Sequence, residues 1–137
     1  MNVFVIGAGG REHALVWKLA RSPHVQAMWC APGNAGIAEI AEVAELAIED
    51  PAAVVAFAKA GGFRLVVVGP EGPLVAGVVD AVRAAGIAAF GPMAAAARLE
   101  GSKGFTKDLA RKAGIPTAGY RRFDSAADAH HYVAMHP

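Results

Sequence analysis

The stretch VIGAGGREH, residues 5–13, decides the fold, because an apolar run passes through three glycines directly into three polar residues. A strand followed by glycines and then a helix leaves unshielded backbone N–H groups at the positive end of the helix, where they can bind a phosphate. The same glycines could instead serve only a tight turn and close helix packing. In a β-α-β setting we favour the phosphate-binding interpretation.

The rest of the chain repeats this alternation of strand and helix. Short runs rich in Val and Ile alternate with segments of helical period, a pattern typical of β-α-β units. The predicted strands are, in chain order, residues 2–6, 26–31, 44–48, 65–69 and 87–91. We therefore predict an α/β fold, a Rossmann-like open parallel sheet of about five strands with helices on both faces.

Helices are predicted between these strands. Asp50-Pro51 is a strong helix start, because aspartate caps the first turn and proline fits within it. The valines at 75, 78, 79 and 82 have helical spacing and predict a single helix that stops at Gly86. The other predicted helices are 11–21, 93–113 with an interruption at 101–104, and a last helix from 124 or 125 to 136.

The end of the chain predicts a second domain. Residues 118–123 suggest a strand, and with the last helix they have little of their own to bury against. About the last 20 residues therefore look like the beginning of another domain. We divide the chain into residues 1–100 and residues 101–137, the second part being a linker helix and the beginning of that domain. A length of 137 residues fits this division.

Composition excludes several classes of function. The chain is 55% hydrophobic and 18% charged, so it should fold, and its net charge of +1 provides no general field for nucleic acid or an anionic membrane. Cys30 is the only cysteine, which excludes an intramolecular disulfide and a cysteine metal cluster. Without a signal sequence or a membrane-spanning stretch, we expect a soluble, cytoplasmic protein with no nucleic-acid or membrane partner.

Two familiar phosphate loops do not fit the glycine-rich stretch. The dinucleotide motif G-x-G-x-x-G starting at Gly7 would need glycine where Glu12 stands, and the second strand ends in residues 29–32 without the acid that binds a ribose. This disfavours NAD and a dinucleotide-dependent oxidoreductase. Residues 101–103, Gly-Ser-Lys, have the wrong order for a Walker phosphate loop.

Two further loops should meet the first at one edge of the sheet. Residues 31–36 follow the second strand and residues 69–74 follow the fourth, and ligands of open parallel sheets gather beyond these strand ends. Glu71 suits an amine or a ribose hydroxyl, but it equally suits a helix N-terminus, where an acid contributes about 0.3–1 kcal/mol. Lys103 is open between a phosphate-binding lysine and a surface one. No metal-ligand spacing is found, since His130 and His131 diverge on a helix.

The ordered motifs of the chain resemble one family of enzymes. GAGGREHAL, APGNAG, VGPEGPLVAGVVD, FGP and LEGSKGFTKD occur in the order found in the N-terminal part of the glycinamide ribonucleotide synthetases, also called phosphoribosylamine-glycine ligases. The resemblance continues through IPTAGYRRF and so covers almost the whole chain. Ala8 stands where many members have asparagine, and Gly72 where alanine is common; neither difference removes a proposed contact.

The resemblance implies a reaction and a set of residues. These enzymes are ATP-grasp ligases of purine biosynthesis that join glycine to 5-phosphoribosylamine with ATP and Mg²⁺, through a glycyl phosphate. It implies that Lys103 approaches the ATP phosphates, and it assigns no catalytic or metal-binding residue to this chain. The substrate-binding residues that it implies are Gly7, Gly9, Gly10, Arg11, Glu12, Gly33, Asn34, Gly69, Pro70 and Glu71.

The resemblance also implies further domains. Family members continue beyond this length into the ATP-grasp domains that cover ATP and hold the magnesium ligands, so we expect an N-terminal fragment that is inactive alone. Its expected partners are phosphoribosylamine, glycine, ATP and those C-terminal domains. The alternative is a stand-alone nucleotide-binding or regulatory module of Rossmann-like fold, and the tail that resembles the opening of the next domain speaks against it.

Overall fold

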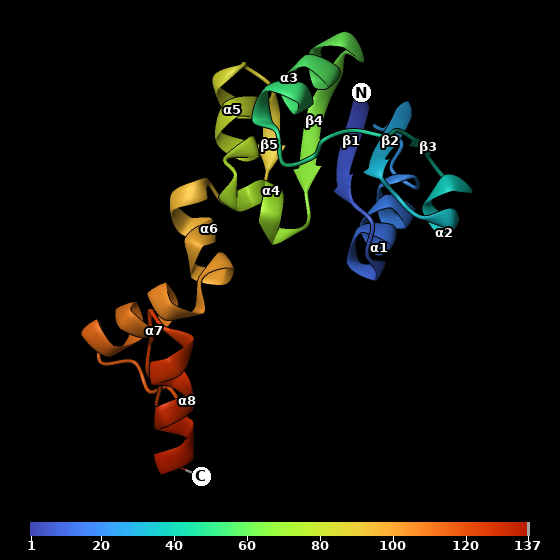
Figure 1. The fold of residues 1–137 in the computed structure, drawn as a ribbon. Coiled ribbons are helices and arrows are strands. Elements are labelled where there is room, and N and C mark those ends of the chain that lie inside the picture. Colours follow the sequence, from blue (N-terminus) through green and yellow to red (C-terminus); the bar gives the residue numbers. More distant parts are fainter. Residues whose placement is uncertain (137) are drawn as a thin grey trace. The chain divides into compact units, whose positions relative to one another are not determined.

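The computed structural model describes residues 1–136, and Pro137 lies outside the described residues (Figure 1). The chain divides into two compact units, Met1–Gly101 and a second that begins at Ser102, and each is described by itself. The first unit holds five strands: β1 Asn2–Gly7, β2 Ala27–Pro32, β3 Glu42–Val43, β4 Phe63–Val68 and β5 Ala88–Phe90. They form one parallel sheet in the order β3-β2-β1-β4-β5. The predicted fold class is confirmed.

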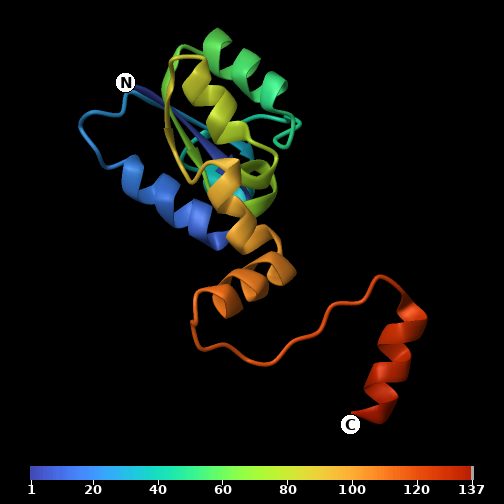
Figure 2. The ribbon, with the colours of Figure 1, turned by 90° about the vertical axis from the view of Figure 1, so that its left-hand side faces the viewer.

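Helices cover both faces of this sheet, with α1 on one face and α3 and α5 on the other (Figure 2). The helices of the first unit are α1 Gly10–Leu19, α2 Ala35–Ala38, α3 Pro51–Ala60, α4 Glu71–Val75, α5 Val78–Ala84 and α6 Ala94–Gly101. None of the helices in residues 1–136 has the length and apolar character needed to cross a bilayer.

The central strand β1 supplies both halves of the core. Successive side chains of a strand point to opposite faces, so Val3 and Val5 pack on the α1 side, whereas Phe4 and Ile6 pack on the α3 and α5 side. All four are fully buried. This two-sided burial explains why β1 is a continuous apolar run in the sequence.

The third strand differs from its prediction. The structure pairs Glu42 and Val43 with β2 and leaves residues 44–48 without a strand. The apolar residues Ala44, Leu46 and Ile48 pack at intervals of two against the core on the α3 side. The Ala44 N–H still donates to the carbonyl oxygen of Cys30 at 2.9 Å, but the rest of the segment is not paired as a strand. An extended connection that packs against the core can therefore show the alternation expected of a strand without being one.

The single helix predicted over residues 75–82 is two helices. Gly77 separates α4 from α5 with φ +88°, a left-handed conformation that glycine adopts without steric cost. Val78, Val79 and Val82 are still buried together, so the helical spacing of the valines survives the break.

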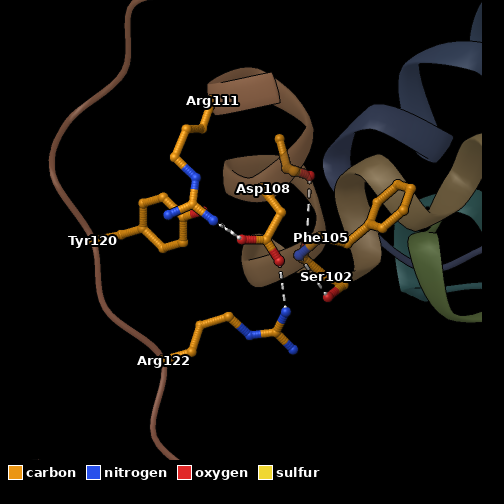
Figure 3. Close-up of polar contacts among 7 residues, drawn as sticks. Ser102, Phe105, Asp108, Arg111, Tyr120 and Arg122 are labelled. Atoms are coloured by element: carbon orange, nitrogen blue, oxygen red, sulfur yellow. Dashed lines mark hydrogen bonds and ion pairs between the residues drawn. The ribbon is translucent and has the colours of Figure 1, made fainter. Parts of the chain in front are cut away.

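The second unit contains α7, Lys103–Lys112, and α8, Ala126–Met135. The strand suggested at 118–123 is absent, because side chains rather than a sheet hold this segment. The Asp108 carboxylate on α7 accepts hydrogen bonds from the Tyr120 hydroxyl and, at 2.7 Å, from Arg122 Nη1 (Figure 3). Arg111 lies 3.4 Å from the same carboxylate. Asp108 therefore ties the extended segment to α7.

The Asp108 cluster predicts a pH dependence. The hydrogen bond from Tyr120 lowers the pKa of Asp108 and raises the pKa of Tyr120. The contact therefore stabilises the second unit at a pH above the pKa of an unfolded aspartate, about 3.9. This stabilisation is lost as the pH falls through the lower pKa that Asp108 has in the folded chain. At high pH, the contact is lost as the pH rises through the raised pKa of Tyr120.

Replacing Asp108 with asparagine should lower the pKa of Tyr120, because the phenol loses its charged acceptor. The measurement is a tyrosinate absorbance titration in a Tyr132→Phe background, which leaves Tyr120 as the only tyrosine. Asp128→Asn, on α8, is the matched control and should leave the titration unchanged. An identical Tyr120 titration with and without Asp108 would contradict the contact.

Candidate functional site

The loop after β1 turns directly into α1. Gly7 ends the strand with φ +137°, a value that favours glycine, and Gly9 is the N-cap of the helix. Glu12, in the first turn, accepts the Gly9 N–H at 2.8 Å through Oε2. The backbone N–H groups of residues 10–12 have no acceptor in a preceding helical turn, so they remain available at the positive end of the helix.

The Glu12 side chain fills the space that three glycines leave open. It is 3% exposed and is the one charged side chain that is buried among residues 1–136. A Cβ atom at Gly7 would lie 2.3 Å from Glu12 Cγ, and one at Gly69 would lie 2.2 Å from Glu12 Oε1. A Cβ at Gly9 would lie 2.8 Å from Glu12 Oε2. Glycine is therefore required at these three positions by the packing of the Glu12 side chain, without any ligand.

Gly10 differs from the other glycines of the loop. A Cβ atom added there meets nothing within 4 Å. Gly10 also begins α1, at the helix end where an anion is favoured. Of the glycines in the VIGAGGREH stretch, Gly10 is the one whose surroundings leave room for a ligand.

Arg11 connects the loop after β1 to the end of β4. Its Nε donates to Glu12 Oε1 at 2.9 Å, and its Nη2 donates to the carbonyl oxygen of Gly69 at 2.8 Å. The hydrogen bond and the charge of Glu12 raise the pKa of Arg11. The side chain is still 59% exposed, so its positive charge is fixed in place yet accessible.

The loop after β2 is joined to the first loop by two hydrogen bonds. The Gly33 N–H donates to the carbonyl oxygen of Gly7 at 3.1 Å, and Asn34 Nδ2 donates to that of Ala8 at 2.7 Å. Asn34 also caps α2, since its Oδ1 accepts the Ile37 N–H at 2.9 Å. Asn34 therefore holds the two loops together from within the protein.

The loop after β4 completes the edge of the sheet. The Gly69 N–H donates to the carbonyl oxygen of Ile6 at 3.1 Å, Pro70 is the N-cap of α4, and Glu71 is its first residue. Glu71 is exposed, and its carboxylate has no hydrogen bond or ion pair with any residue of 1–136. Its charge contributes to the raised pKa of Arg11. An acid without a partner therefore stands beside a fixed cation.

A pocket of about 520 Å³ lies between the ends of β4 and β5, and Arg11 and Gly69 line it. The strand order reverses between β1 and β4, which is where open parallel sheets bind ligands. The pocket adds Phe90, Pro92 and Glu100 to the candidate site. The sequence did not predict a role for these residues, although the FGP motif at the end of the fifth predicted strand was a usable signal.

The ten predicted substrate-binding residues thus lie in three joined loops at one edge of the sheet. Lys103 belongs to the second unit, where it begins α7 next to the cap Ser102, whose Oγ accepts the Phe105 N–H at 3.3 Å. No group of three or more His, Cys, Asp or Glu side chains within residues 1–136 could hold a metal ion.

Comparisons with known proteins agree with one another. A family profile described as "Phosphoribosylglycinamide synthetase, N domain" matches residues 1–100. The phosphoribosylamine–glycine ligase of Agrobacterium fabrum is 59% identical over 97% of this chain and 31% of its own length. That of Streptomyces coelicolor is 62% identical over 86% of this chain and 28% of its own length. The chain thus spans about a third of the length of these relatives.

Solved structures show the same relationship. The crystal structure of phosphoribosylamine–glycine ligase from Thermotoga maritima has a TM-score of 0.68 and 27% identity, over 98% of this chain and 30% of that one. A biotin carboxylase domain of a bacterial carboxylase has a TM-score of 0.66 at 18% identity, over 98% of this chain and 34% of that one. The second likeness shows a shared fold alone.

Proposed function

Because the chain belongs to the family of phosphoribosylglycinamide synthetase N domains, we propose that it holds 5-phosphoribosylamine for an ATP-dependent ligase that joins this amine to glycine. The observation that carries the proposal is the joined edge of three loops, where open space at Gly10 adjoins the fixed cation of Arg11. We also propose that residues 1–100 form the substrate-binding domain and that residues 101–137 begin the next domain.

The first unit offers suitable groups for each part of this substrate. The N–H groups at the start of α1 and the Arg11 guanidinium suit the phosphate, because both are positive and directional. Glu71 is free to accept hydrogen bonds from the amine or a ribose hydroxyl. Gly33 and Asn34 support the loop that carries Gly10.

The proposed chemistry is a condensation. ATP transfers its γ-phosphoryl group to the glycine carboxylate, which gives glycyl phosphate and ADP. The amine nitrogen then attacks the carbonyl carbon, the C–N bond forms as phosphate leaves, and the nitrogen loses a proton. Holding the amine beside the activated carboxyl can contribute about 7–11 kcal/mol to such a step. In this proposal Lys103 approaches the ATP phosphates. Mg²⁺, glycine and most of ATP bind to the further residues that the longer relatives contain.

The test is a pair of titrations of the 137-residue chain. Glycinamide ribonucleotide and NAD are added separately to isotope-labelled protein, and the backbone amides of residues 7–12, 33–36 and 69–74 are followed. Saturable shifts in all three loops with the ribonucleotide alone are expected. Shifts with NAD alone would favour the dinucleotide alternative, and silence with both would contradict substrate holding by this chain.

Replacing Gly10 with leucine should weaken binding of glycinamide ribonucleotide at least about tenfold, which corresponds to about 1.4 kcal/mol. A Cβ atom added at Gly10 meets nothing within 4 Å, so we expect the fold to be retained, while the longer leucine side chain should cover the N–H groups at the start of α1. Calorimetric titration measures the affinity, and a thermal melt checks the fold. Gly10→Ala is the matched small control. If Gly10→Leu bound glycinamide ribonucleotide as tightly as the unsubstituted chain, the ligand would not bind at Gly10.

A further inference from the structure

Glu12 is shielded from any ligand at this edge. Both of its carboxylate oxygens have protein donors, Gly9 N–H at 2.8 Å and Arg11 Nε at 2.9 Å, and the residue is 3% exposed. A buried carboxylate is tolerated only when it is paired and hydrogen-bonded, and both conditions are met here. The close approach of Gly7 and Gly69 to its side chain closes the remaining space.

Arg11 has the opposite character. Two of its N–H groups are used, one by Glu12 and one by the carbonyl oxygen of Gly69, while its side chain is 59% exposed. The other guanidinium N–H groups have no hydrogen-bond partner among residues 1–136. A carboxylate would repel a phosphate, whereas a guanidinium with free N–H groups binds it in a defined direction.

We propose that Glu12 is a positioning residue, which holds the Arg11 guanidinium against the end of β4 and does not itself touch the substrate. The inference rests on the proposed function, because it takes the ligand at this loop to be a sugar phosphate. Without the Glu12 charge, only the hydrogen bond to the Gly69 carbonyl oxygen restrains Arg11, and the guanidinium can leave that bond for solvent. The fixed orientation of its free N–H groups is then lost, which lowers phosphate affinity.

The inference is tested with ribose 5-phosphate as the probe and the full 137-residue chain. Glu12→Gln keeps the size of the side chain and an oxygen for the Gly9 N–H, but removes the charge that holds Arg11. We expect about tenfold weaker binding in Glu12→Gln. In an Arg11→Gln background the same change should have no further effect. The inference would be overturned if Glu12→Gln weakened binding equally in the chain with Arg11 and in the Arg11→Gln chain. It would also be overturned if Glu12→Gln did not weaken binding in the chain with Arg11.

A second measurement needs no ligand. The Arg11 Nε–H signal of the free chain should exchange slowly with water, and should exchange faster and shift in Glu12→Gln. Arg21, which stacks on Trp17 and donates to its carbonyl oxygen, provides the control signal and should not change. An unaltered Arg11 signal in Glu12→Gln would overturn the positioning role. Failure of the unsubstituted chain to bind ribose 5-phosphate would instead count against the proposed function.

If Glu12→Gln does not fold, Arg11→Lys decides the question. Lysine keeps the charge but, with one nitrogen in place of a planar fork, cannot hold Glu12 and the Gly69 carbonyl in the same geometry. Weaker binding of ribose 5-phosphate by a folded Arg11→Lys chain is expected. Binding equal to that of the arginine chain would show that charge alone matters, and would overturn the inference.

Discussion

Gly7→Ala should reduce the free energy of unfolding of the first unit by about 2–6 kcal/mol. A side chain at φ +137° is strained, and strain of this kind costs about 1–3 kcal/mol. The new Cβ would also lie 2.3 Å from Glu12 Cγ, so Glu12 must leave its buried position and give up its hydrogen bonds. Losing such bonds adds about 1–3 kcal/mol. Urea denaturation followed by circular dichroism measures the change.

Gly62 provides the matched control for Gly7. It also has a positive φ, +61°, but a Cβ there meets nothing within 4 Å. Gly62→Ala should therefore show only the conformational cost, about 1–2 kcal/mol. Equal losses for the two variants would mean that Glu12 adapts without cost, and would contradict the close packing of Glu12 under the loop.

Phe4→Ala should cost about 3–5 kcal/mol, the range for removal of a buried aromatic side chain. Phe4 is fully buried in the central strand, and its ring centroid lies 5.0 Å from that of Phe57 and 5.5 Å from that of Phe63. The neighbouring strands hold the backbone in place and prevent collapse of the cavity. A domain of this size has a total stability of about 5–15 kcal/mol, so much of it would be lost.

The same denaturation experiment measures the Phe4 variant, and Phe90→Ala is its control. Phe90 is 66% exposed at the end of the edge strand β5, so its removal should change the stability by no more than about 0.5 kcal/mol. A Phe4→Ala chain as stable as Phe90→Ala would mean that the aromatic cluster does not form the core on this face.

Most of the helices and strands could be predicted from short stretches of the sequence. Asp50 caps α3 as predicted, because its carboxylate accepts the N–H groups of Ala52 at 2.9 Å and Ala53 at 3.3 Å. Such contacts join residues that are neighbours in the sequence and can be read from it. The third strand could not be read in this way, because the alternation at 44–48 records packing against the core and says nothing about pairing.

The edge of three loops could be predicted, but the packing inside it could not. Parallel strands bring their carboxyl ends together, so the loops at residues 7–12, 33–34 and 69–71 follow from topology. The burial of Glu12 depends on the approach of Gly69, and the bond from Arg11 to Gly69 spans 58 positions of the chain. No local pattern distinguishes a glycine that admits a ligand from one that admits a neighbouring side chain.

The lengths of the outer strands bear on the solubility of the protein at high concentration. A sheet edge carries unpaired N–H and C=O groups, and a long, flat edge can recruit a strand from another molecule and start aggregation. Here the edges are β3, with two residues, and β5, with three, while the long apolar strands β1 and β4 are enclosed between neighbours. An outer strand at 44–48 would have offered a longer template for such intermolecular pairing than Glu42 and Val43 do.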